Sequence, residues 1–440
     1  MTKTMIFAAG AVTLGWVAQG AASPLATRVA ADFPGRSGAA FYHYAVPAMS
    51  EQQRLPDAYP TDGRAGGTVN VIVARDEYED GAFLVWPNRD LGKVKLEIGD
   101  LKQVKVRGGG EERETGVVFP KEDLDLRVVK VWYQNRNAWF SYFGDTGMKL
   151  VPELLLHDDD LIRVDTKKVS NYAKLVDKDG RKSEFWLNPP RDMSRRELDA
   201  PWVQVERFPS MRGDFNDAKT LQPVTLGKEA FRCFFLTVHA KKDAKPGVYR
   251  GEVKVKGEGE QRIGSIPVAV RVLDFALPQP KCWRCPEKDF LVSFYTCANF
   301  SSILPLNGND VARAKRQLVN IFRNQVAHNQ AVNWIGCNMS NDAYFTFDAM
   351  KEAGMRTDIH FSVFGPVYGD KYAEDRPQRI ADELDRRIGN HNSYVGHGDE
   401  PGAKWLEQTR PVYEAYQKAG LKFIIAGGDQ VFNMAGYLYD

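Results

Sequence analysis

The sequence predicts a multidomain chain, β and then α/β, in which an antiparallel β-sandwich precedes a (β/α)8-type barrel truncated at its C-terminal end. The length of 440 residues exceeds one ordinary domain and suits two. From about residue 60 to about residue 275, short apolar or alternating runs are separated by turn residues, as in antiparallel sheets. After about residue 289, strand and helix patterns alternate, which favours parallel strands with covering helices.

Residues 1–23 have the plan of a secretory signal peptide. Lys3 precedes an apolar run that ends near Ala18, and small residues follow before Pro24. The run is shorter than the ~20 residues that span a bilayer, so we expect cleavage near Ala22 and not a membrane anchor. No other stretch is long and apolar enough to cross a membrane. The sequence therefore predicts an exported protein, periplasmic or extracellular, with no membrane span.

The composition argues against a nucleic acid partner. The net charge is only +2, and Lys and Arg alternate with Asp and Glu, as in "VKVRGGGEERETG". No basic stripe emerges, whereas nucleic acid binding leaves such a footprint. With 43% hydrophobic and 26% charged residues, the chain has the profile of a globular protein. Nothing in the pattern indicates an assembly state.

The predicted sandwich region covers residues 24–278. Its strand-like runs are "GTVNVIVARDEY", "GAFLVWP", "FRCFFLTVHA", "GVYRGEVKVKG" and "GSIPVAVRVLDFALP". The stretch from about 135 to about 200 is less regular, and "HDDD" (157–160) is predicted to be a solvated turn. A calcium loop is disfavoured there because no spaced oxygen ligands follow.

A linker is predicted at residues 279–288, where prolines stop strand pairing. Cys282 and Cys285 form a CxxC motif in it, which could be half of a zinc site or a redox pair. A second pair of zinc ligands is missing, since Cys297 and Cys337 stand alone. We therefore expect a local disulfide or free thiols, and neither a metal nor an organic cofactor.

The partial barrel is predicted at residues 289–440. No GxGxxG follows any strand, so a barrel is favoured over an open nucleotide-binding sheet. A full barrel takes ~250 residues, and only about 150 remain, which suggests five or six of eight units and a fragment of a longer reading frame. The predicted strands are 290–296, 331–336, 358–365, 393–398 and 422–428, and the predicted helices are 309–329, 342–354, 377–389 and 402–420.

Two adjacent carboxylates, Asp399 and Glu400, follow the fourth of these strands in "YVGHGDEPGA". Barrel enzymes carry their chemistry at the C-terminal ends of their strands, so the pair is the candidate catalytic group. The alternative is that one of the two caps the next helix, with Pro401 in its first turn. Four further residues are predicted to line the same mouth and bind substrate: Trp334, Asn338, His360 and His397.

Glycoside hydrolysis suits a carboxylate pair, but ordinary glycosidases place their two carboxyls about 5–10 Å apart across the bond. Adjacent residues suit the substrate-assisted route, in which the 2-acetamido oxygen of the sugar attacks the anomeric carbon. Glu400 would then act as general acid and later as base, and Asp399 would hold the acetamido N–H. A like-charged neighbour also makes Glu400 hold its proton more tightly, as a general acid requires.

Two segments resemble the N-terminal β-sandwich of glycoside hydrolase family 123 and its uncharacterised relatives: residues 240–278, which contain "PGVYRGEVKVKG", and residues 75–101. In that family a (β/α)8 barrel follows, with an Asp-Glu pair after its fourth strand, and "GHGDEP" (396–401) matches this position. The resemblance implies that Asp399 orients the acetamido group and Glu400 is the acid/base. It implies an exo-β-N-acetylgalactosaminidase that acts on a glycan or glycoconjugate.

Two rival functions stay open on the sequence. One is a barrel glycosidase with its acid on strand four and a carboxylate nucleophile beyond residue 440. The other is a secreted carbohydrate-binding protein without catalysis. It would bind glycans without turnover, and Glu400→Gln would have no effect on any rate.

Overall fold

The computed structural model describes residues 23–106, 110–135, 148–176, 179–187, 215–280, 283, 293–294, 298–335, 341–362, 375–399 and 402–426. The chain divides into two compact units. The first contains Met1–Asn171 and Asp217–Leu277, and the second contains Tyr172–Asn216 and Pro278–Asp440. The predicted signal peptide up to Ala22 lies outside the described residues, as do both cysteines of the CxxC motif.

The first unit contains two large sheets. In the six-stranded sheet the strand order is β2-β1-β4-β14-β8-β9, and in the seven-stranded sheet β13-β5-β15-β16-β3, with β6 joining β15 to β7. Neighbouring strands are antiparallel, except that β3 runs parallel to β16. The strands are β1 (Phe41–Val46), β2 (Arg64–Ala65), β3 (Val69–Arg75), β4 (Glu77–Pro87), β5 (Gly92–Ile98), β6 (Leu101–Val106), β7 (Glu112–Phe119), β8 (Leu124–Asn135), β9 (Met148–Leu156), β13 (Val224–Leu226), β14 (Arg232–Ala240), β15 (Gly247–Lys256) and β16 (Arg262–Ala276).

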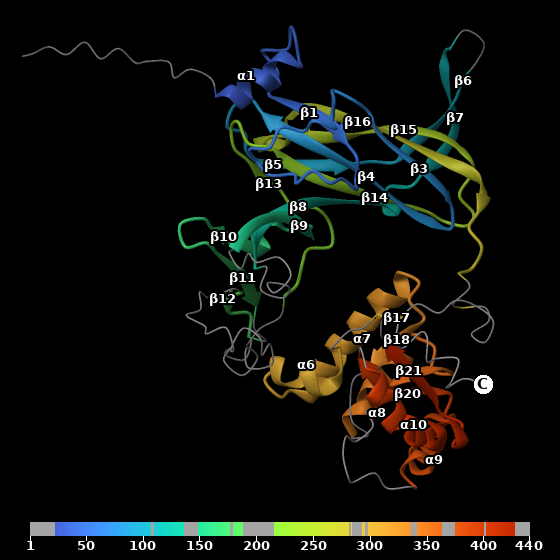
Figure 1. Cartoon of the computed structure of the whole chain (residues 1–440). Helices are drawn as coiled ribbons and strands as arrows, with labels where there is room; N and C mark the ends of the chain where they lie inside the picture. Colours follow the sequence, from blue (N-terminus) through green and yellow to red (C-terminus); the bar gives the residue numbers. More distant parts are fainter. Residues whose placement is uncertain are drawn as a thin grey trace, which may run out of the picture. The chain divides into compact units, whose positions relative to one another are not determined.

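The two sheets pack face to face, as the two layers of strands in Figure 1 show. Gly81 on β4 lies so close to β3 that a Cβ there would stand 2.8 Å from Val69 Cγ1 and 3.0 Å from Val71 Cγ2. Phe83 and Phe234 stack in the same layer, with ring centroids 5.3 Å apart. The absence of a side chain at Gly81 therefore sets the spacing between the sheets at this point.

Helix α1 (Pro24–Ala31) covers the outer face of the six-stranded sheet. Ser23 caps it, because its Oγ accepts from the N–H of Ala26 at 3.1 Å. Val29 is fully buried in a cluster with Leu84 and Trp86. Both faces of the middle of β4 are thus apolar and buried, which explains why "GAFLVWP" is continuous and not alternating.

A smaller three-stranded sheet consists of β10 (Ile162–Asp165), β11 (Ser170–Val176) and β12 (Lys182–Trp186), and the boundary between the two units falls within β11. These strands and β9 lie in the stretch that the sequence pattern left irregular. "HDDD" does form a turn, the 3₁₀ helix η3 (Asp159–Leu161), but the prediction that it is solvated is wrong for Asp159. That carboxylate is only 14% exposed and lies 2.5 Å from Arg232 and 3.1 Å from Lys130. Two other 3₁₀ turns are η1 (Lys121–Asp123) and η4 (Glu258–Glu260).

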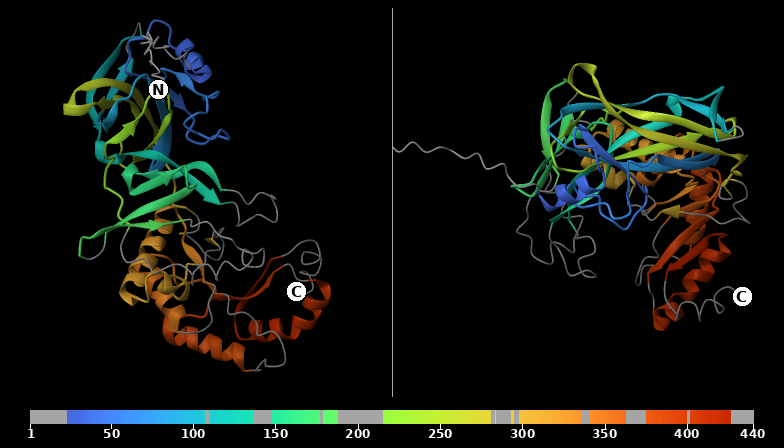
Figure 2. Two further views of the ribbon diagram at one scale, coloured as in Figure 1. Left: turned by 90° about the vertical axis from the view of Figure 1, so that its left-hand side faces the viewer. Right: turned by 90° about the horizontal axis from the view of Figure 1, so that it is seen from above.

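The second unit is built on a curled parallel sheet with helices between its strands, which confirms the predicted α/β class (Figure 2). Five strands form it within the described residues, in the order β17-β18-β19-β20-β21, and they do not close a barrel. The strands are β17 (Ser293–Phe294), β18 (Val332–Ile335), β19 (His360–Ser362), β20 (Ser393–Asp399) and β21 (Lys422–Ala426). The helices are α6 (Phe300–Leu306), α7 (Val311–Ala327), α8 (Asn341–Glu352), α9 (Arg376–Ile388) and α10 (Ala403–Lys418).

Local chemistry sets the helix limits of this unit. Asp310 caps α7 by accepting from the N–H of Arg313 at 3.0 Å, and Gly389 ends α9 with a φ of 91°. Helix α10 begins at Ala403, next to the predicted start at residue 402, and Pro411 lies inside it. Tyr416 of α10 packs against Leu384 of α9 in a buried cluster, which fixes the helix beside β21. Within the described part of the chain, no helix is both long and apolar enough to cross a membrane.

Candidate active site at the carboxyl end of the parallel sheet

Asp399 is the last residue of β20 and pairs in register with Ala426, the last residue of β21. The strands run parallel, so this position lies at the carboxyl edge of the sheet. Loops that follow parallel strands meet at this edge, and α/β proteins bind their ligands there. The acidic position therefore has the location that catalysis in this fold class requires.

The structure bears on the helix-cap alternative at Asp399 only. The N-cap of α10 is Gly402, whose backbone is extended (φ −75°, ψ 162°) and which makes no side-chain cap hydrogen bond. Asp399 belongs to β20 and stands three residues before this cap. Asp399 is therefore not the N-cap residue of α10. Glu400 lies outside the described residues.

The predicted substrate-binding residues lie at different heights on the sheet. His397 is in β20, level with Ile424 of β21 and two residues before Asp399. His360 is the first residue of β19, level with Ser393. Ser393 precedes Asp399 by six residues, or about 20 Å along a strand. His397 therefore lies near Asp399 on β20, whereas His360 lies toward the amino end of the parallel sheet.

Trp334 is level with Phe361 of β19, which is level with Tyr394 of β20. It therefore stands five residue positions before Asp399, or about 16 Å along the strand direction. Asn338 follows β18 and lies outside the described residues. The sequence does not reveal these different positions along the sheet, because the alternation of side chains along a strand does not give the register between strands.

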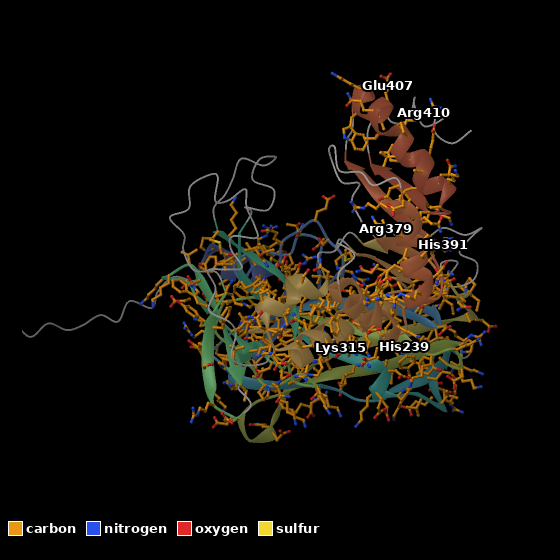
Figure 3. The ribbon with its side chains drawn as sticks, turned by 90° about the horizontal axis from the view of Figure 1, so that it is seen from below. His239, Lys315, Arg379, His391, Glu407 and Arg410 are labelled. Atoms are coloured by element: carbon orange, nitrogen blue, oxygen red, sulfur yellow. The ribbon has the colours of Figure 1, made fainter. Side chains whose placement is uncertain are left out.

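The amino end of β20 is held by structural contacts. The ring of Tyr394 lies 5.3 Å from Nζ of Lys422, which donates to Oδ1 of Asn392 at 2.7 Å. His391, labelled in Figure 3, lies with its Nδ1 2.8 Å from Oδ2 of Asp385 on α9. These contacts tie the amino end of β20 to α9 and β21.

Two tyrosines of this unit have raised pKa values because they are packed between helices. Burial, then the nearby Glu383 charge, raises the pKa of Tyr344 on α8 to about 12. Its hydroxyl donates to Glu383 Oε1 of α9 at 3.3 Å, and the guanidinium of Arg387 lies 3.9 Å from its ring centroid. Burial likewise raises the pKa of Tyr416 on α10. Because these groups join helices and are not at strand ends, they add no further catalytic candidate.

Among the described residues, no group of three or more His, Cys, Asp or Glu side chains is arranged to hold a metal ion.

The fold and the strand-end carboxylate define a protein of the β plus α/β class with a candidate active site at the carboxyl edge of its parallel sheet. No protein-family model and no curated relative matches the sequence. Among solved structures, the chain is similar to a family 123 glycoside hydrolase from Clostridium perfringens, from a study of glycolipid glycan hydrolysis. The two share 11% identity with a TM-score of 0.47, over 79% of this chain and 57% of that chain. This chain therefore spans less than two thirds of the length of that protein, which belongs to the family that the sequence resembles.

Proposed function

We propose that this protein is an exported glycoside hydrolase of the exo-β-N-acetylgalactosaminidase type, which uses the acetamido group of its substrate as the nucleophile. The observation that carries the proposal is the position of Asp399, the final residue of a parallel strand and not the cap of the following helix. The carboxyl ends of parallel strands are where α/β enzymes place the groups that meet a substrate.

The adjacent Glu400 completes the chemistry. It protonates the leaving oxygen as the glycosidic bond breaks, while the acetamido oxygen attacks the anomeric carbon from the other face. Asp399 accepts the acetamido N–H and so holds that oxygen in line with the anomeric carbon. Glu400 then takes a proton from water, and the water opens the cyclic intermediate with net retention. Neither step needs a second protein carboxylate across the sugar, which adjacent residues could not supply.

The positions of the other candidate residues along the strands guide the assignment of sugar contacts. His397 shares β20 with the acidic position, whereas His360 and Trp334 lie five or six residues nearer the amino end. We therefore assign the sugar contacts to His397 and to the segment after β18 that contains Asn338. Trp334 and His360 then support the sheet below the site.

Inhibition by a thiazoline mimic of the acetamido intermediate tests the mechanism. The mimic resembles an intermediate that only the substrate-assisted enzyme forms, so it should inhibit competitively, far more tightly than the free sugar. Hydrolysis that is insensitive to the mimic would instead favour a protein carboxylate as nucleophile. Glycan binding without turnover would favour a non-catalytic carbohydrate-binding protein.

Export is the second part of the proposal. Cleavage near Ala22 leaves Ser23 in place, and this residue caps α1. The mature chain would thus keep the whole helix that covers the sandwich. Amino-terminal sequencing of protein from the periplasm or medium should begin near Ser23, and a chain that still begins at Met1 in the cytoplasm would contradict export.

A further inference from the structure

A polar bracket in the first unit joins two points of the chain that lie about sixty residues apart. The carboxylate of Asp217 accepts from the backbone N–H groups of His157 and Asp158, both at 2.8 Å. In return, the backbone oxygen of His157 accepts from the N–H of Gln222 at 2.7 Å. The chain between these points contains β10, β11 and β12. The hydrogen bonds of the bracket therefore hold the two ends of this segment together.

The imidazole of His157 lies at the centre of the bracket and is only 7% exposed. Its Nδ1 is 2.7 Å from the backbone oxygen of Ala218, and its Nε2 is 2.6 Å from Oδ1 of Asp125 on β8. A backbone oxygen can only accept, and so can an ionised carboxylate. Both ring nitrogens must therefore carry hydrogen if both contacts are hydrogen bonds, and a ring with two N–H groups is a cation.

Acidic side chains lie near both nitrogens of the ring. Oδ2 of Asp125 accepts from Nε of Arg127 at 2.7 Å. Oδ2 of Asp217 lies 3.6 Å from Nδ1 of His157. The neighbouring charges are thus Asp125 and Arg127 from β8 and Asp217 from the returning segment, with Asp158 next along the chain. Two carboxyl groups therefore lie close to the ring, and the one guanidinium nearby is hydrogen-bonded to Asp125.

We propose that Asp125, His157 and Asp217 form a proton-dependent clasp, closed while His157 carries both ring protons and loosened when it loses one. A neutral imidazole has one N–H for two acceptors, so either Ala218 or Asp125 loses its hydrogen bond. The returning segment, which leads into β13, is then held by fewer bonds. This clasp is independent of the glycosidase proposal, because none of its residues lies in the parallel sheet.

Nitrogen NMR of the histidine side chains in the whole protein tests the charge state without any substitution. At about pH 5.5, the low side of the usual imidazole range, both nitrogens of His157 should show directly bound protons. At about pH 8.5 only one should. A ring with a single N–H at both values would overturn the proposal. His157→Gln identifies the resonance.

Hydrogen exchange measures the loosening. After correction for intrinsic rates, the Gln222 amide should exchange about five- to tenfold faster at the higher pH, the effect of one lost hydrogen bond. Amides of β15 should keep their ratio, which excludes global loosening. In His157→Gln the Gln222 amide should show no such pH dependence, whereas His328→Gln, a change at an exposed ring, should behave as wild type. Equal exchange at both pH values in the wild-type protein would contradict the clasp.

Discussion

Asp399 of β20 and Ala426 of β21 lie directly opposite each other as the last residues of neighbouring parallel strands. Three residues beyond Asp399, Gly402 is the N-cap of α10. Together these facts separate the acidic position from the helix and leave it at the edge where α/β enzymes react. The predictions on activity below depend on this separation.

Asp399→Asn should lower kcat/KM on 2-acetamido sugars by about 100-fold or more, because the amide no longer holds the acetamido N–H and the internal nucleophile loses its alignment. Initial rates with matched aryl glycosides, with and without the acetamido group, measure this effect. An equal fractional loss on sugars that lack the group would show that Asp399 does not orient it.

His397→Ala should raise KM or lower kcat more than His360→Ala does. His397 stands two residues from Asp399 on the same strand, whereas His360 lies level with Ser393 at the other end of the sheet. Steady-state kinetics of the two variants, with unfolding curves to show that both remain folded, form a matched pair. A greater kinetic loss in the His360 variant would place the sugar at the opposite edge.

His43→Gln should flatten the dependence of sandwich stability on pH. Burial lowers the pKa of His43 below its usual 6.5, and the ring lies 3.1 Å from the backbone oxygen of Gly67. As the pH falls below 6.5, the unfolded chain binds a proton that the folded chain does not, so the free energy of unfolding decreases down to the folded-state pKa.

The measurement is the difference in the free energy of unfolding between wild type and His43→Gln from about pH 8 to about pH 5. This difference should be constant above the ordinary histidine pKa. Below it, the free energy of unfolding of the wild type should fall relative to that of His43→Gln. A difference that is constant over the whole range would show that His43 titrates alike in both states.

Gly81→Ala should destabilise the first unit by about 1–3 kcal/mol, because the new methyl group would lie 2.8 Å from Val69 of the facing sheet. Gly99→Ala is the control, since a Cβ there meets nothing within 4 Å. Urea unfolding followed by circular dichroism gives both values. Equal stabilities of the two variants would show that the sheets can separate at β4 without cost.

The strand–helix alternation after the linker was predictable because each element there has its own period and its own caps. Gly389 and Asp310 stand where the helix limits fall. Helix α6 was missed, because it has only seven residues and contains Pro305. The strands β9 to β12 were missed because much of their surface is only half-buried and alternation is weak.

The register between parallel strands was beyond prediction for a different reason. Strand period fixes which residues share a face, but the pairing of His360 with Ser393 depends on how loops and helices seat each strand. For the same reason the sequence could group His360 with the acidic pair although the two lie at opposite ends. The bracket around His157 joins residues about sixty positions apart, and no local pattern marks it.

The central claim is that the pair after β20 is catalytic, and release of 4-nitrophenol from its N-acetyl-β-galactosaminide tests it most directly. The protein from its full reading frame should hydrolyse this substrate and leave the plain galactoside unchanged. Glu400→Gln should lower kcat by about 100-fold or more on natural glycans, and by less on this aryl substrate, whose leaving group needs little protonation. Two results would contradict the account. One is undiminished turnover of both the natural glycans and the aryl N-acetyl-β-galactosaminide by a folded Glu400→Gln variant. The other is no turnover of the aryl N-acetyl-β-galactosaminide by the folded wild-type protein.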